Sequence, residues 1–294
     1  MKQYLIPEVL AKLKGLDLKA RLVVEGFLAG LHRSPYYGFS VEFADYRPYV
    51  PGDEIRRIDW KTYGRTDRYY IKEFEEETNV KAYILLDKSG SMSYKTGTLS
   101  KYEYSQILAA SLAFLLIKQR DSVGLITFDR KLVEYVPPSA KKSHLQILLG
   151  CIDRSQPGGE TDLATTFFQM SERIKRRGLI VVISDLLDDP LKIIKALKSF
   201  RYRKHEILVF HVLDPQEWRF SFNTAARFVD LETKEEVPLD PVALQESYRK
   251  RIKEFVKTYQ RGLLESYIDY ELLFTDVPFD RALLSYLAKR EKMP

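Results

Sequence analysis

Four strongly apolar runs, each followed by a polar loop, constrain the fold of this chain more than any other feature of its sequence. They occupy residues 80–87, 122–129, 178–185 and 206–214, and stretches with helical periodicity separate them. A parallel strand that is covered by helices on both faces is buried on both sides, so its sequence is continuously apolar. The pattern therefore predicts an α/β, Rossmann-like fold with a mostly parallel central sheet and helices on both faces.

The segments on either side of these runs have other patterns. Residues 7–32 carry leucine and valine at helical spacing, which predicts one or two amphipathic helices. Residues 227–238 are typical of an exposed hairpin that turns at Thr233–Lys234. We therefore divide the chain into N-terminal helices with a β appendage, residues 1–78, and a large α/β domain, residues 79–294.

Composition excludes several classes of protein. The 294 residues contain a single cysteine, Cys151, so the chain has neither an internal disulfide framework nor a thiolate metal site. No run reaches the roughly 18 apolar residues that a membrane span requires, and the N-terminus lacks the apolar core of a signal peptide. We expect a cytoplasmic protein without a membrane span.

The net charge of +6 raises the question of nucleic-acid binding. Residues 1–80 hold 13 basic and 13 acidic side chains, and no segment is a basic tail. Basic clusters occur at 173–177, 201–204 and 249–253, where the first two close expected helices and suit the negative end of the helix dipole. Solvated helix faces are the favoured interpretation and no nucleic-acid partner is expected, with binding of a phosphate backbone kept as an alternative.

Three loops at the ends of expected strands carry hydroxyl and carboxylate side chains. Asp87, Ser89 and Ser91 follow the first apolar run, Thr161 precedes the helix expected at 162–177, and Asp185 ends the third run. Because the carboxyl ends of parallel strands meet at one edge of a sheet, these side chains are expected to converge. Each loop taken alone could instead be a helix cap or a turn.

The chemistry of this set favours a hard cation. The four histidines are scattered along the sequence, so zinc, copper or iron has little support. Mg²⁺ prefers oxygen ligands, keeps several waters and is often held by one or two carboxylates, and Mn²⁺ or Ca²⁺ are alternatives with similar preferences. The sequence thus predicts a magnesium site formed by five residues: Asp87, Ser89, Ser91, Thr161 and Asp185.

The spacing Asp87-x-Ser89-x-Ser91, with Thr161 in a Gly-Gly-x-Thr-Asp-Leu loop and Asp185 after an apolar strand, resembles the metal-ion-dependent adhesion site of von Willebrand factor A-type domains. The segment from Tyr49 to Trp60, continuing through Glu75, resembles a narrower bacterial and archaeal family, domain of unknown function fifty-eight. The resemblance covers roughly residues 35–215 and all five expected metal-site positions match.

The resemblance implies a mode of action without catalysis. In von Willebrand factor A-type domains of this kind, a glutamate or aspartate of a partner protein completes the coordination of the metal. The narrower family is associated with MoxR-type AAA+ ATPases in chaperone-like assemblies. We therefore expect a non-enzymatic, Mg²⁺-dependent protein-interaction module, and specifically an adaptor for such an ATPase.

Alternative interpretations concern Asp87 and residues 45–77. A metal-dependent phosphatase with Asp87 as nucleophile is an alternative, although such an enzyme would need a second carboxylate where Ser89 stands. Residues 45–77 alternate charged with aromatic side chains, which fits either a β appendage anchored by Trp60 or a second partner-binding face.

Overall fold

The computed structural model describes residues 6–31, 46–49, 58, 60–72, 81–159, 162–222, 226–229, 231, 236–239 and 241–291. The chain forms two compact units, Met1–Gly30 with Val80–Pro294 and Leu31–Asn79. This division differs from the predicted one, because the N-terminal helices α1 (Pro7–Ala11) and α2 (Leu16–Leu31) group with the large unit. Both helices bury apolar side chains. A helical pattern in the sequence predicts such an apolar face but does not show which unit it packs against.

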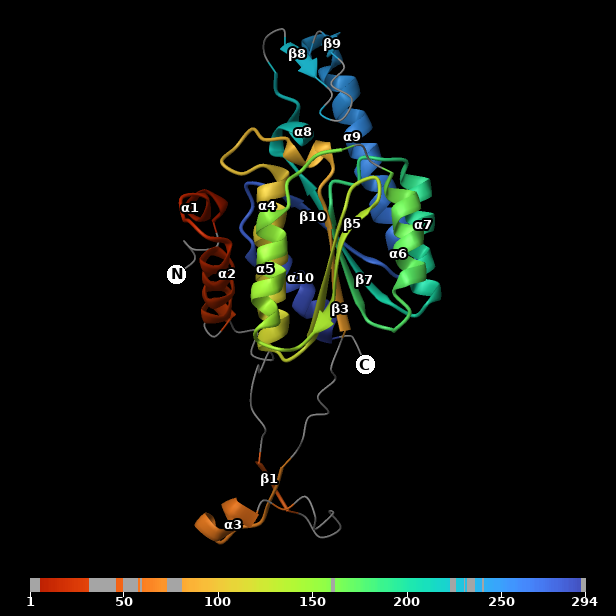
Figure 1. Ribbon diagram of the computed structural model, residues 1–294. Helices are drawn as coiled ribbons and strands as arrows, with labels where there is room; N and C mark the ends of the chain where they lie inside the picture. The colour runs from red at the N-terminus through yellow and green to blue at the C-terminus, as the bar shows by residue number, and fades with distance from the viewer. Residues whose placement is uncertain are drawn as a thin grey trace. The chain divides into compact units, whose positions relative to one another are not determined.

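A six-stranded sheet forms the centre of the large unit, in the order β10-β7-β6-β3-β4-β5 (Figure 1). All neighbouring strands are parallel except the edge pair β4 and β5, which is antiparallel. The strands are β3 (Lys81–Asp87), β4 (Ser122–Phe128), β5 (Leu132–Ser139), β6 (Leu179–Ser184), β7 (Glu206–Leu213) and β10 (Asp269–Phe274). The predicted Rossmann-like α/β fold with a mostly parallel central sheet is confirmed.

Helices cover both faces of this sheet, and Figure 1 shows α4 and α5 on one side and α6 and α7 on the other. On the first side, Tyr104 of α4 stacks on Phe279, which directly precedes α10, at 4.3 Å between ring centroids. On the second side, α6, α7 and α9 share one apolar cluster with the sheet. These helices are α4 (Lys101–Lys118), α5 (His144–Arg154), α6 (Leu163–Arg173), α7 (Pro190–Tyr202), α9 (Pro241–Leu264) and α10 (Asp280–Glu291).

Burial on both faces explains the apolar runs of the sequence. Every residue of β6 is buried, and all residues of β3 after Lys81 are buried as well. The two strands lie side by side at the middle of the sheet, where the strand order reverses direction. In open sheets of this type, the loops at the carboxyl ends of such strands diverge and leave room for a ligand.

Two smaller elements follow β7. The hairpin of β8 (Ala226–Val229) and β9 (Glu236–Leu239) is antiparallel as predicted, and its expected turn at Thr233–Lys234 lies outside the described residues. The short helix α8 (Pro215–Arg219) was not expected, because five residues are too few to show a helical period. No helix in the described ranges combines the length and the apolar character needed to cross a membrane.

The small unit contains β1 (Tyr46–Pro48) and β2 (Tyr70–Lys72), which pair antiparallel, and the helix α3 (Trp60–Thr66). Tyr63 of α3 stacks on Tyr69 at 4.5 Å between ring centroids. The Trp60 side chain is 58% exposed and packs edge-on against Tyr63 among the described rings.

Candidate functional site

Asp87 is the last residue of β3 and is completely buried. Its two carboxylate oxygens are held in different ways. The backbone N–H of Ser89 donates to Oδ1 at 2.8 Å, and the hydroxyl of Ser184, at the end of the neighbouring strand β6, donates to Oδ2 at 2.5 Å. Asp87 is therefore fixed at the point where the two middle strands of the sheet end.

Ser89 and Ser91 lie in the loop that follows β3. A single 3-10 turn, η3 (Gly90–Ser93), brings their hydroxyl oxygens to 3.0 Å from each other. Two ligands in neighbouring positions of a Mg²⁺ octahedron, each about 2.1 Å from the ion, also lie about 3.0 Å apart. The spacing of the two hydroxyl groups therefore fits a magnesium ion.

The loop that carries these serines is held from a second loop. The N–H of Gly90 donates to the carbonyl of Gly159 at 3.0 Å, and the N–H of Gly158 donates to the carbonyl of Lys88 at 2.8 Å. Thr161, the expected third hydroxyl ligand, lies outside the described residues. Its neighbour Asp162 caps α6 by accepting a hydrogen bond from a backbone N–H.

Asp185 directly follows β6 and is 1% exposed. The next residue, Leu186, has a φ of 51°, a left-handed conformation that is costly for a bulky side chain. Its N–H donates to the Ser184 hydroxyl at 2.9 Å, and the Tyr259 hydroxyl of α9 donates to its carbonyl at 2.9 Å. These two hydrogen bonds support the unusual turn that presents Asp185 at the edge of the sheet.

Lys101, the first residue of α4, is the site residue that sequence reasoning missed. It is fully buried, and its ammonium group donates to Asp185 Oδ2 at 2.7 Å and to Glu217 Oε1 at 2.6 Å. Glu217 belongs to α8, where its other carboxylate oxygen accepts from the N–H of Asp214 at 2.8 Å. In the sequence, a lysine at the start of a helix looks like an ordinary solvated charge, so no local signal identifies it.

The buried charges shift one another's pKa values. Burial and then the negative charge of Asp185 raise the pKa of Asp87 from 3.8 to about 7, although hydrogen bonds from Ser184 and Ser89 act in the opposite direction. Burial alone would lower the pKa of Lys101, but the Asp185 and Glu217 carboxylates outweigh it and raise that pKa. A carboxylate that is this costly to ionise is one that a cation would stabilise.

Four of the five predicted ligands are thus brought to one edge of the sheet: Asp87, Ser89, Ser91 and Asp185. Within the described ranges, no three His, Cys, Asp or Glu side chains gather as metal ligands. The candidate set contains only two carboxylates and otherwise hydroxyl groups. This donor set suits Mg²⁺, which accepts neutral oxygen ligands and water, better than a transition metal.

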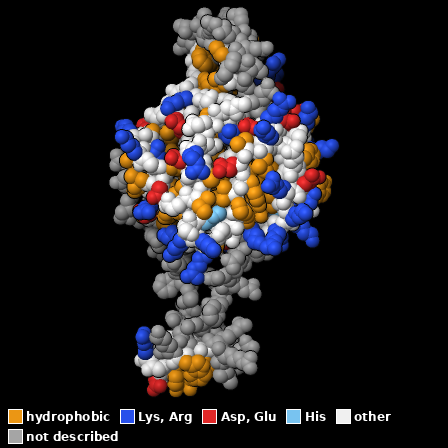
Figure 2. All heavy atoms as spheres, viewed as in Figure 1, with side chains coloured by type: hydrophobic (Ala, Val, Ile, Leu, Met, Phe, Trp, Pro, Cys, Tyr) orange, Lys and Arg blue, Asp and Glu red, His pale blue; other side chains and the backbone are white. Residues whose placement is uncertain are grey.

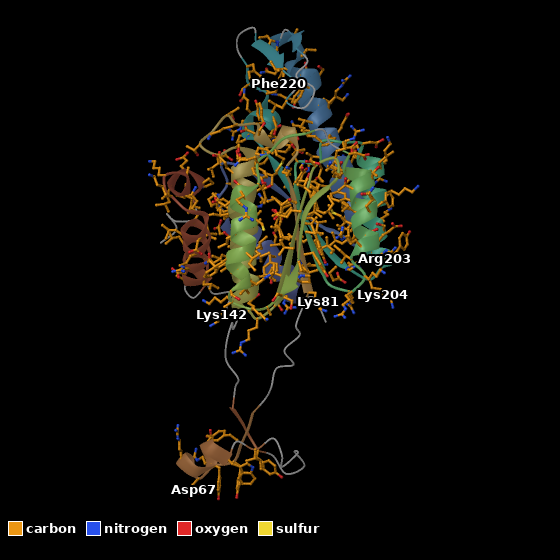
Figure 3. All side chains as sticks on the ribbon, viewed as in Figure 1. Asp67, Lys81, Lys142, Arg203, Lys204 and Phe220 are labelled. Atoms are coloured by element: carbon orange, nitrogen blue, oxygen red, sulfur yellow. The ribbon has the colours of Figure 1, made fainter. Side chains whose placement is uncertain are left out.

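Two of the three basic clusters lie away from this site. The first two follow the ends of α6 and α7, as predicted, and their Arg203 and Lys204 lie at the end of the sheet where Lys81 begins β3 (Figure 3). Asp87 lies at the opposite end of β3. On the face seen in Figure 2, lysine and arginine side chains are interspersed with acidic and apolar ones. The arrangement is that of solvated helix ends.

A mostly parallel sheet with one antiparallel edge strand and helices on both faces is a Rossmann-like fold of the von Willebrand factor A type. The chain belongs to the family described as "Protein of unknown function DUF58", whose model matches residues 45–261. Family and fold thus agree with the resemblance in the sequence.

The chain is also similar to individual proteins. The chain is 28% identical over 214 residues to the uncharacterized protein Rv1480 of Mycobacterium tuberculosis, covering 72% of this chain and 67% of that protein. An aerotolerance-related membrane protein from Bacteroides fragilis has a similar fold, with a TM-score of 0.50 at 17% identity over 73% of this chain and 100% of that one. The SpRpn10 VWA domain matches with a TM-score of 0.41 at 10% identity, covering 70% of this chain and 94% of that domain.

Proposed function

We propose that this chain is a non-enzymatic protein-interaction module whose Mg²⁺-dependent site binds an acidic side chain of a partner protein. One observation carries the proposal: two serine hydroxyl oxygens 3.0 Å apart lie next to the buried carboxylate of Asp87 at the switch point of the sheet. Mg²⁺ would be the resident ion, with Mn²⁺ or Ca²⁺ able to replace it. Ser89, Ser91 and Asp87 would hold it, together with Thr161 and Asp185.

The surroundings of the serines support binding rather than hydrolysis. A nucleophilic serine requires a base within hydrogen-bond reach. The described histidines are all buried and bonded to groups other than these serines: His144, His205 and His211. Asp87 is also a poor nucleophile for phosphoryl transfer, because hydrogen bonds engage both of its oxygens and Ser89 occupies the position of the second carboxylate.

The partner we propose is a MoxR-type AAA+ ATPase, for which this chain would act as an adaptor in a chaperone-like assembly. Membership of the DUF58 family supports this choice. An adaptor with a metal site needs a partner that offers a carboxylate, so the contact is expected to depend on a glutamate or aspartate of the ATPase.

Binding of the purified chain to a MoxR-type ATPase from the same genome tests the proposal. Affinity would be measured with Mg²⁺ and with EDTA, for the wild type, Asp87→Ala and the control Asp129→Asn. Asp129 follows β4 at the same edge of the sheet but pairs with Lys88 at 3.7 Å and belongs to no predicted ligand set. Binding should require Mg²⁺, be lost in Asp87→Ala and persist in Asp129→Asn. Equal binding in EDTA would refute a metal-dependent contact.

A further inference from the structure

A fully buried lysine between two carboxylates is an expensive arrangement. Removing an ammonium group from water costs several kcal/mol, and well-packed apolar side chains often serve stability as well as a buried ion pair does. Lys101 is 0% exposed, whereas Glu217 retains a side-chain exposure of 15%. Lys101 contacts Asp185, a predicted metal ligand, so a role for Lys101 in the metal site explains this arrangement better than stability does.

The geometry assigns Lys101 a positioning role: it withholds one oxygen of Asp185 from the metal and keeps this carboxylate out of direct coordination. The inference rests on the proposed function, because it concerns the same ion. Asp185 Oδ2 lies 2.7 Å from the ammonium group, and Oδ1 accepts a hydrogen bond from the N–H of Leu187 at 3.3 Å. Because its Oδ2 is bonded to a cation, unlike either oxygen of Asp87, Asp185 would reach a divalent ion through water.

This arrangement changes the charge that the ion presents to a partner. If Asp87 and Asp185 both acted as free carboxylates, they would neutralise a divalent cation. Because Lys101 holds one oxygen of Asp185, this carboxylate would stay outside the coordination shell, and the ion with its direct ligands would keep a net positive charge. The site then binds the cation weakly by itself and gains more from the carboxylate of a partner. Lys101 thus couples metal binding to capture of an acidic side chain.

The ammonium group is held in this position from the side of α8. Glu217 contacts Lys101 with one oxygen and the N–H of Asp214 with the other. Asp214 in turn accepts hydrogen bonds from the N–H and the hydroxyl of Thr96, in the loop between β3 and α4. The loops after β3, β6 and β7 are therefore linked through one network of hydrogen bonds.

Titration of the full chain with Mn²⁺ alone, followed by isothermal calorimetry, tests the inference. The decisive protein is the double variant Lys101→Met/Glu217→Gln, which has the net charge of the wild type and leaves no unpaired buried carboxylate at residue 217. Because the variant frees Asp185, it should bind Mn²⁺ about tenfold more tightly than the wild type. Lys101→Arg, which keeps the cation, should bind as weakly as the wild type.

Two outcomes would overturn the inference: a double variant with the affinity of the wild type, or an Lys101→Arg protein that binds as tightly as the double variant. Circular dichroism would verify that each variant is folded. Failure of the proposed function would give another result: the wild type would not bind Mn²⁺, or it would bind Mn²⁺ with the same affinity as Asp87→Ala. Binding that is lost in Asp87→Ala but unchanged in the double variant refutes the role of Lys101 alone.

Discussion

Replacement of Asp87 by asparagine is expected to make the metal-free protein more stable, although the same change should destroy its metal site. The Asp87 carboxyl is fully buried and has its pKa raised from 3.8 to about 7, chiefly by burial and by the charge of Asp185. At about 1.4 kcal/mol per pKa unit, keeping this group ionised costs about 4 kcal/mol at pH 8. An asparagine does not carry that cost.

Part of the gain is offset by hydrogen bonding. The asparagine side-chain oxygen can still accept from the N–H of Ser89, but its amide group would face the hydroxyl of Ser184, which must then accept instead of donating. Rearranging one such bond costs about 1–2 kcal/mol. The net stabilisation of Asp87→Asn over the wild type is therefore expected to be about 2–3 kcal/mol.

Urea unfolding in EDTA at pH 8 measures this difference directly. The advantage of the variant should grow as the pH rises from about 4 to about 7 and should then stay constant. Over that range the wild-type carboxyl is ionised in the unfolded state but still protonated in the folded state. Excess Mg²⁺ should stabilise the wild type and leave the variant unchanged. If Asp87→Asn were less stable than the wild type in EDTA at pH 8, the buried carboxylate would not be destabilising in the metal-free protein.

Two further predictions concern the sheet itself. Burial lowers the pKa of His211 from 6.5 to about 4, so the unfolded state gains a proton first as the pH falls, and stability should drop by about 2 kcal/mol between pH 7 and pH 5. Urea unfolding of Asp87→Asn would reveal this loss of stability, because the variant lacks the opposing pH dependence of the Asp87 carboxyl. A free energy of unfolding that does not change between pH 7 and pH 5 would contradict the prediction. A Cβ at Gly178 would lie 2.1 Å from the carbonyl oxygen of Lys81, so Gly178→Ala should lower the free energy of unfolding by about 3 kcal/mol. A Cβ at Gly97 would have nothing within 4 Å, so the control Gly97→Ala should change it by less than about 0.5 kcal/mol. Thermal unfolding compares the two alanine variants, and equal midpoints would refute the close approach of the strands.

The strands of the large unit could be predicted because burial on both faces leaves a direct record in the sequence. A strand such as β6 has to be apolar throughout, and the residue that follows it has to lie at the edge of the sheet. That rule placed Asp87 and Asp185 at one edge. It also placed Ser89 and Ser91 in the same loop, although their 3.0 Å spacing depends on the η3 turn.

Lys101 and Glu217 could not be found in the same way. Both are charged residues in the first turn of a helix, a position that is normally solvated. Lys101 is buried, and Glu217 is partly buried, because the loops after β6 and β7 close over the start of α4. This closure involves segments more than 80 residues apart. The exposure of Trp60 is likewise a property of the folded unit that a lone tryptophan in a sequence does not reveal.

The claim on which this account depends is that a divalent cation binds at the carboxyl ends of β3 and β6. Anomalous diffraction at the manganese edge, from crystals grown with Mn²⁺, locates such an ion without assuming its ligands. The account predicts an anomalous peak about 2.2 Å from the hydroxyl oxygens of both Ser89 and Ser91. Density with no peak at this edge, and with the two hydroxyl groups still bonded to each other, would contradict it.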